Sequence, residues 1–266
     1  MTSIVLDSIS TNPDAASIRQ SSGSTDWMWA AFAVLMLTDI LLVVNSFRAL
    51  RNRLLHQLAI IIVTTASVAY FSMASNLGHT PIPVEFTGAG DGTRSIYYVR
   101  YIMWFINAPL LLLTLYIGTG FPLQGVFSAL FLSDVAVVCG LVGALVQTSY
   151  KWGYYVIGVF ALFYVIGHMF TTPVAWPSPT GRSRGAYNGS AVVLATLALI
   201  YPLVWGLCEG GNELSVIAEM IWYGIMDVLI FSFFVAYFLW AHDSVELDGA
   251  YPVSARPTKA AEAGAA

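Results

Sequence analysis

Several ionisable side chains stand within or beside long apolar stretches, where a charge is costly, and Arg100, Glu209, Glu219 and Asp227 are the ones that could form a site. Deep in a membrane-spanning helix, such a group costs about 2.5 to 3.5 kcal/mol on insertion scales, so it faces the protein interior and takes a partner. Arg100 and Asp227 carry opposite charges and are the natural pair. One interpretation is a site that binds or transfers a proton or ion. The alternative is an ion pair that only satisfies a polar core.

The other reactive side chains form no catalytic or metal-binding pattern. Cys139 and Cys208 lie in apolar stretches and are interpreted as buried thiols, since two cysteines make neither a disulfide framework nor a metal cluster. His168 has no second His or Cys at ligand spacing, so no metal is predicted. No nucleophile, base and orienting group occur in a plausible arrangement, which predicts that the protein is not an enzyme.

The composition indicates where the chain resides. Of its 266 residues, 58% are hydrophobic and 10% are charged, and the mean hydropathy is +0.73. An ordinary soluble domain has roughly 25% charged residues. The formal net charge is only -4 and basic runs are absent, which excludes a nucleic acid partner. The partner that composition indicates is the lipid bilayer, around a multi-pass membrane protein.

Long apolar stretches follow one another along the chain, each close to the roughly 20 residues that a helix needs to span a bilayer. Polar, glycine and proline clusters separate them, including the polar turn at 209–212. We predict an all-α bundle of seven transmembrane helices, with spans at 26–49, 56–78, 96–118, 124–147, 151–173, 187–208 and 214–241.

Basic residues beside the spans predict the orientation. Short cytoplasmic loops collect Lys and Arg, and these residues are enriched after the first span, between the fifth and sixth, and in the tail. The N-terminus is therefore expected outside and the C-terminus in the cytoplasm. The expected parts are a polar extracellular segment at 1–25, the transmembrane domain at 26–242 and a cytoplasmic, disordered tail at 243–266.

Several stretches resemble sequence motifs of the microbial rhodopsins. Residues 100–113 resemble the RYxxW...PLLLL signature of their third helix. Residues 201–206 resemble the YPxxWG motif of the sixth helix, and Glu-Gly-Gly-Asn follows soon after, as in fungal members. Residues 140–145 and 150–154 add a match across the fourth and fifth helices. The resemblance covers about 26–242 in order and implies the microbial rhodopsin fold.

The chain departs from the family pigments where they bind retinal. The resemblance implies a retinal lysine four residues after a counterion aspartate in helix seven; here Asp227 is followed at that distance by Phe231. The two lysines, Lys151 and Lys259, lie at the predicted outer end of helix five and in the tail. A Schiff base needs an amine, which phenylalanine lacks. We therefore predict no covalent retinal and no other cofactor.

Further departures affect proton transfer. By resemblance, Met103 stands at the proton-acceptor position of the pumps, Thr114 at the donor position, and Ala198 where a tryptophan usually packs on the polyene. A thioether cannot accept a proton in place of a carboxylate. Asn107 begins an Asn-Ala-Pro stretch where the pumps have Thr-Thr-Pro. The resemblance thus implies a vestigial pocket formed by Met103, Trp104, Asn107, Ala198, Tyr201, Trp205, Asp227 and Phe231.

Two expectations concern the interior. By family arrangement, Arg100 and Asp227 would lie near each other across the centre, with Glu209 and Glu219 toward the outside as parts of a residual polar or ion site. Trp104, Tyr201, Trp205 and Tyr223 are expected to line a central aromatic space. With Phe231 placed inward, a filled core is favoured over a site for a small apolar ligand.

The retained motifs and lost photochemistry resemble the lysine-less fungal opsin-related proteins, including heat-shock-type plasma-membrane proteins. The resemblance implies a stress-linked regulator or chaperone of plasma-membrane proteins such as the proton ATPase. No motif indicates contact with that ATPase. The alternative is an ion or proton channel, a transporter or a photoreceptor-like sensor of the same family, although the cytoplasmic half offers few polar groups for a continuous route. An oligomer is compatible with the sequence.

Overall fold

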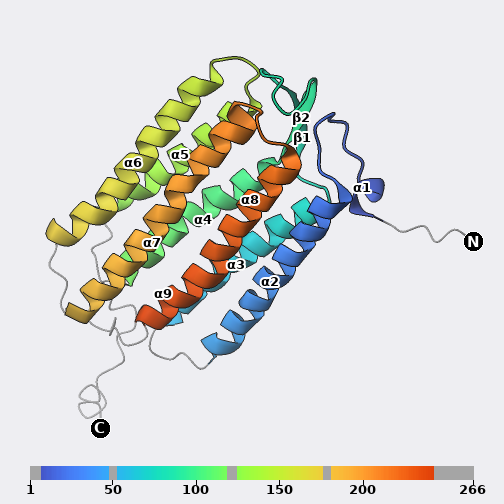
Figure 1. Cartoon of the computed structure of the whole chain (residues 1–266). Coiled ribbons are helices and arrows are strands. Elements are labelled where there is room, and N and C mark those ends of the chain that lie inside the picture. Colours follow the sequence, from blue (N-terminus) through green and yellow to red (C-terminus); the bar gives the residue numbers. More distant parts are fainter. Residues whose placement is uncertain (1–6, 48–52, 119–124, 176–180, 243–266) are drawn as a thin grey trace, which may run out of the picture.

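Seven long helices form the body of the molecule and run alongside one another as a bundle (Figure 1). The computed structural model describes residues 7–47, 53–118, 125–175 and 181–242. Within these residues, seven helices are long and apolar enough to cross a membrane. The predicted all-α seven-helix bundle is therefore confirmed. The predicted tail at 243–266 lies outside the described residues.

The elements follow the predicted order, with short additions at one end of the bundle. They are α1 (Ser8–Thr11), α2 (Ser22–Ser46), α3 (Arg53–Ala74), β1 (Thr80–Pro83), β2 (Thr93–Ile96), α4 (Tyr98–Ile117), α5 (Phe127–Leu145), α6 (Lys151–Ala175), α7 (Gly181–Trp205), η2 (Gly206–Gly210), α8 (Val216–Val228), η3 (Leu229–Phe234) and α9 (Val235–His242). The segments η2 and η3 are π-helical. The sixth span thus combines α7 with η2, and the seventh combines α8, η3 and α9.

Two boundaries differ from the predicted ones for local reasons. The first long helix begins at Ser22 rather than at 26 because Ser21 caps it: the Ser21 hydroxyl accepts from the Ser24 amide at 3.4 Å, and the Ser24 hydroxyl accepts from the Ser21 amide at 3.0 Å. This reciprocal capping box draws a polar stretch into the first turn. The sixth span continues to Gly210, so Glu209 lies in η2 and not in a turn as predicted.

The segment before α2 joins a small sheet at one end of the bundle. Strands β1 and β2 pair antiparallel, with Thr80 opposite Ile96, and form a hairpin between the second and third spans. The Ile18 amide donates to the Thr93 carbonyl at 2.9 Å, and the Ser95 amide donates to the Ile18 carbonyl at 3.0 Å. Figure 1 shows α1, the hairpin and the α7–α8 connection at the same end, which we call the hairpin end.

The core and the outer surface of the bundle are both apolar. Buried residues such as Leu35, Ile62 and Phe231 belong to one core cluster that several helices share. Large side chains such as Phe131 and Phe160 remain 67% and 70% exposed within the spans. Exposed apolar surface of this extent suits a lipid environment, because water would not solvate it favourably.

Candidate functional site

Asp227 lies fully buried in α8, where four helices meet. Its carboxylate accepts three hydrogen bonds from neutral donors. The Tyr70 hydroxyl of α3 donates to Oδ2 at 2.7 Å, the Tyr201 hydroxyl of α7 donates to Oδ1 at 2.5 Å, and the Trp104 indole of α4 donates to Oδ1 at 3.3 Å. The carboxylate is therefore satisfied by hydrogen bonds from neutral groups. No sequence motif had singled out Tyr70.

Phe231 lies beside this carboxylate network, inside the bundle. It follows Asp227 by about one helical turn and is fully buried. Its ring centroid is 5.2 Å from that of Trp104, the residue whose indole donates to Asp227. The chain here is π-helical over η3 (Leu229–Phe234). An apolar ring thus occupies the position where the resemblance implies a retinal lysine.

Neither lysine of the chain lies near Phe231 in the sequence, and the structure places Lys151 at the hairpin end. It is the first residue of α6, and its Nζ lies 3.4 Å from a carboxylate oxygen of Glu85 and donates to the Gly210 carbonyl at 3.2 Å. Lys259 lies outside the described residues. The ammonium of Lys151 is therefore held by partners at the end of the bundle.

The positions to which the resemblance assigns the proton-transfer groups of pumps hold other side chains in α4. Met103 is 1% exposed and belongs to the apolar core. The Asn107 amide nitrogen donates to the Ile62 carbonyl at 3.0 Å, and no donor among the described residues reaches its Oδ1. The Thr114 hydroxyl donates to the Leu110 carbonyl of its own helix at 2.7 Å. This face of α4 therefore presents a thioether, an amide and a hydroxyl that bonds its own backbone.

Arg100 pairs with Glu219 and not with Asp227. Its Nη1 lies 2.8 Å from Oε1 of Glu219, and its guanidinium carbon lies 4.1 Å from the ring centroid of Tyr223. The predicted pair of Arg100 with Asp227 is wrong, because Glu219 stands about two turns earlier on the same helix and takes the guanidinium. The cation–π contact with Tyr223 adds to this placement.

A second buried arginine, Arg94 of β2, binds the other oxygen of Glu219. Its Nη2 lies 2.7 Å from Oε2, and its Nη1 donates to the Asn212 side chain at 2.8 Å and the Leu214 carbonyl at 2.6 Å. Burial lowers the pKa of Arg94, but the Glu219 charge and hydrogen bond outweigh burial, so the pKa is raised. The sequence offered one signal for this role, the position of Arg94 shortly before Arg100.

Glu209 lies near this ion pair but is bound by tyrosines. The Tyr101 hydroxyl donates to Oε1 at 2.8 Å, and the Tyr223 hydroxyl donates to Oε2 at 3.3 Å. Tyr223 therefore links Glu209 to Arg100, with its hydroxyl on Glu209 and its ring against the guanidinium of Arg100. The predicted polar site divides into two parts: a cluster at the hairpin end, and the separate Asp227 network. The cluster consists of Arg94, Arg100, Glu209 and Glu219.

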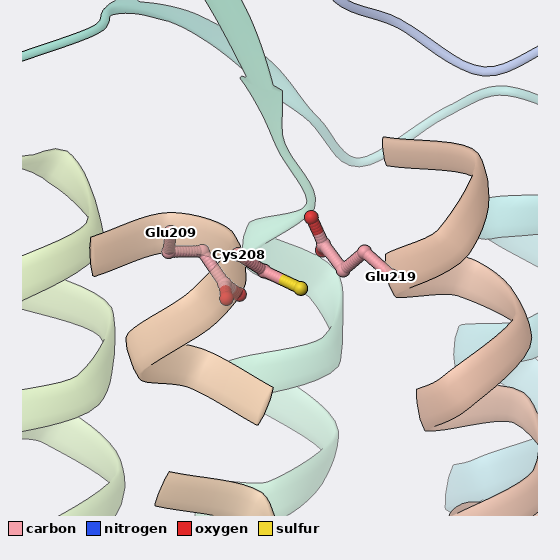
Figure 2. A group of neighbouring side chains, drawn as sticks. All are labelled: Cys208, Glu209 and Glu219. Atoms are coloured by element: carbon pink, nitrogen blue, oxygen red, sulfur yellow. The ribbon is translucent and has the colours of Figure 1, made fainter. Parts of the chain in front are cut away.

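Cys208 adds a thiol to this cluster, as Figure 2 shows. The ligand atoms of Cys208, Glu209 and Glu219 lie within 4.8 Å of one another, and all three residues are buried. Cys208 and Glu209 come from η2 and Glu219 comes from α8. Two guanidinium groups already hold the oxygens of Glu219 and two tyrosine hydroxyls hold those of Glu209, so a metal cation would have to displace these donors. The absence of a metal site stays a prediction.

A cavity of about 200 Å³ lies between α4, α5, α6 and α7. The four aromatic residues expected to line a central space all line it, and so does Ala198; the four are Trp104, Tyr201, Trp205 and Tyr223. The expectation of a filled core is wrong, because Phe231 fills space beside Trp104 but does not reach this cavity. Small residues on the facing helices, Gly140, Gly158 and Ala136 among them, leave the space open.

Comparisons with known proteins agree with this geometry. The model of the bacteriorhodopsin-like protein family matches residues 22–242. Protein FDD123 of Trametes versicolor is 48% identical over 231 residues, which cover 86% of this chain and 81% of the relative. The 30 kDa heat shock protein of Saccharomyces cerevisiae is 31% identical over 268 residues, covering 90% and 78%.

Solved structures agree as well. The crystal structure of Coccomyxa subellipsoidea rhodopsin CsR, a light-driven proton pump, has a TM-score of 0.76 with this chain at 31% identity. The aligned part covers 86% of this chain and 99% of the pump. Together with the family match and the helix-three and helix-six motifs, these likenesses show that the chain belongs to the bacteriorhodopsin-like protein family, in its fungal opsin-related branch.

Proposed function

We propose that this membrane protein forms no covalent retinal pigment, pumps no protons, and acts under stress as a regulator or chaperone of plasma-membrane proteins. The observation that carries the proposal is the buried ring of Phe231 beside the Asp227 network. A retinal Schiff base requires a primary amine at this depth. The ammonium of Lys151 is bound at the hairpin end, to Glu85 and Gly210.

The surroundings of α4 support the absence of pumping. A proton acceptor must offer a basic atom, such as a carboxylate oxygen, within hydrogen-bond reach of the group that gives up the proton. Met103 offers a thioether packed in the apolar core, and Thr114 donates to the carbonyl of Leu110. Asp227 keeps its carboxylate, but that carboxylate is bound by Tyr70, Tyr201 and Trp104. The proton-transfer positions of pumping relatives are thus filled by groups that hold no exchangeable carboxylic proton.

The regulatory part of the proposal rests on the family. One relative bears the name 30 kDa heat shock protein, and the motifs resemble the lysine-less branch linked to stress and to the plasma-membrane proton ATPase. The exposed apolar faces of the spans are compatible with contact to other membrane proteins as well as to lipid. Regulation of an ATPase or chaperoning of membrane proteins is therefore the role that we propose for the bundle.

The channel or transporter alternative has less support. The polar cluster of Arg94, Arg100, Glu209 and Glu219 is gathered at the hairpin end, where its members bind one another or neighbouring tyrosines. The cavity that continues into the bundle has a mainly apolar wall. An ion leaving the cluster would lose its polar ligands on entering this cavity. A conducting path would need a rearrangement of the bundle.

Retinal titration tests the chromophore part. Purified wild type, Phe231→Lys and Phe234→Lys are incubated with all-trans-retinal, and visible absorbance is followed before and after hydroxylamine. We expect no hydroxylamine-sensitive band in the wild type and a band in Phe231→Lys, because only that lysine stands one turn from Asp227. Phe234→Lys is the matched control, since Phe234 is also buried in η3. A hydroxylamine-sensitive pigment in the wild type would refute the proposal.

Crosslinking tests the partner part. The chain is crosslinked in intact cells before and after heat stress and is then purified. A light-driven pump of the same family, treated in the same way, is the control. We expect a plasma-membrane protein that is enriched only with this chain and only after stress. ATPase activity of plasma membranes with and without the chain then tests the proton ATPase directly. If no plasma-membrane protein were enriched, the regulatory role would be rejected.

A further inference from the structure

We propose that the cavity between α4, α5, α6 and α7 holds the acyl chain of a bilayer lipid without a covalent bond. The inference rests on the proposed absence of a covalent retinal, because a chromophore attached in this bundle would compete for the same interior. The regulatory role proposed above names no ligand, and the acyl chain supplies one. Three observations support it: the shape of the cavity, the chemistry of its wall and its position between helices.

The cavity is long and narrow and follows the axis of the bundle. Along α6 its wall extends from Tyr155 to Met169, a rise of fourteen residue steps, which corresponds to about 21 Å at 1.5 Å per step. Along α4 the wall extends from Arg100 to Leu112, or about 18 Å. A volume of about 200 Å³ spread over this length gives a slender space. An extended hydrocarbon chain parallel to neighbouring lipids has this shape.

Most polar groups of the cavity wall are bound within the protein, and the exception is Arg100 at the hairpin end, whose Nε has no hydrogen-bond partner among the described residues. The Tyr155 hydroxyl donates to the Pro202 carbonyl at 3.1 Å, and the Trp205 indole donates to the Gly140 carbonyl at 3.0 Å. The Ser133 hydroxyl donates within its own helix. Beyond the Arg100 end, a polar ligand group would therefore be buried without a partner, at a cost of roughly 1 to 3 kcal/mol. An apolar cavity of this size stays dry and takes apolar guests.

The position of the cavity gives a chain from the bilayer a way in. Leu162 and Ile166 of α6, and Ala198 and Pro202 of α7, line the cavity and are only half-buried, although all four stand within spans. Helix α6 packs closely on α5 and much less on α7. An acyl chain can therefore enter between α6 and α7 while its headgroup remains at the membrane surface, in water. A free molecule with a polar end would have to bury that end.

The cavity is also separate from the position of the missing lysine. Trp104 and Tyr201 contribute to its wall, whereas Phe231 and Asp227 do not. Tyr201 and Trp104 turn their polar atoms away from the cavity, toward Asp227. A ligand in the cavity would therefore contact aromatic carbon and not the buried carboxylate. This arrangement favours an uncharged hydrocarbon over an amine.

Photocrosslinking tests this assignment in the intact protein. The chain is placed in nanodiscs of a phosphatidylcholine that carries a diazirine in one acyl chain, irradiated, and digested for mapping by mass spectrometry. We expect adducts on Val165, Met169 and Leu194, which line the cavity and are 5%, 2% and 6% exposed. Lipid on the outer surface cannot reach these buried side chains, whereas it labels Phe163, which is 55% exposed.

Variants that fill the cavity make the test specific. Ala198→Trp should lower the buried adducts at least about tenfold, because the indole occupies the space of the chain, and should leave Phe163 labelling unchanged. Leu199→Trp, at the neighbouring lipid-facing position, should change neither. Related pigments usually carry tryptophan at the position of Ala198, so the fold accommodates it. Ala136→Leu fills the cavity from the α5 side and should also lower the buried adducts, so the test does not depend on Ala198→Trp alone.

Three results would overturn the assignment. The first is labelling of outer residues alone in the wild type, and the second is buried adducts that persist in both filling variants. The third is loss of the buried adducts when all-trans-retinal is added and co-purifies, which would make the cavity a retinoid site. The proposed absence of a retinal pigment fails separately, through a hydroxylamine-sensitive visible band in the wild type without added lipid.

Discussion

Replacing Glu219 with glutamine should destabilise the protein far more than the same replacement at Glu209. Both glutamates are buried, at 1% and 5% exposure, and both belong to the cluster at the hairpin end. They differ in their partners. Glu219 binds the guanidinium groups of Arg94 and Arg100 at 2.7 and 2.8 Å, whereas Glu209 accepts from two tyrosine hydroxyls. Glu219→Gln therefore removes the ionic partner of two guanidinium groups, whereas Glu209→Gln removes a charge that only neutral hydroxyls bind.

The magnitude follows from those partners. Removing one member of a buried ion pair costs about 3 to 5 kcal/mol, because the other charge stays buried without compensation. In Glu219→Gln, two guanidinium groups face a neutral amide. In Glu209→Gln, the amide oxygen still accepts one tyrosine hydroxyl, and the loss of one hydrogen bond costs about 0.5 to 1.5 kcal/mol. We expect the free energies of unfolding to differ between the variants by about 2 to 4 kcal/mol.

The assay is reversible unfolding in mixed micelles with increasing dodecyl sulfate, followed by helical circular dichroism and tryptophan fluorescence. Glu213→Gln controls for the general effect of removing a carboxylate, because Glu213 is exposed, and it should change the free energy of unfolding by less than about 0.5 kcal/mol. Equal losses for Glu219→Gln and Glu209→Gln would refute the reasoning, since they would show that the two guanidinium groups do not depend on Glu219.

Two further predictions concern helix packing and capping. Gly224→Ala should destabilise the protein by about 1 to 3 kcal/mol, because the added carbon would lie 2.4 Å from Nε1 of Trp27. Gly167→Ala, in an open part of α6, should instead stabilise it by up to about 1 kcal/mol, and thermal unfolding of both variants checks the opposite signs. Ser21→Ala should cost about 0.5 to 2 kcal/mol through loss of the cap of α2, with faster amide hydrogen exchange confined to the first turn. If exchange stayed slow there, the cap would not hold that turn.

Features that depend on local spacing could be predicted from the sequence. Each span is a continuous apolar stretch of bilayer length, so its existence follows from composition without knowledge of neighbouring helices. The four-residue step from Asp227 to Phe231 is about one helical turn, which places both side chains on the same side of the seventh span. Their common contact with Trp104 agrees with that spacing.

Local chemistry that opposes the apolar pattern was harder to predict. The residues from Ser22 to Thr25 are polar and were assigned to the N-terminal segment, yet the capping box at Ser21 makes them helical. The π-helical insertion before Gly210 likewise brings Glu209 into a helix. In both places a few hydrogen bonds outweigh the average polarity on which the boundaries were based.

Only the tertiary structure decided which groups meet. The sequence determined that no lysine stands where the resemblance implies the retinal lysine, that Arg100 and Asp227 stand within apolar spans, and that seven stretches are long and apolar enough to cross a membrane. It could not show that Arg100 binds Glu219, because opposite charges pair by distance in space, and Arg94 reaches the same carboxylate from a strand outside the spans. Nor could it show the cavity, because the space between helices is what remains after side chains from four of them have packed.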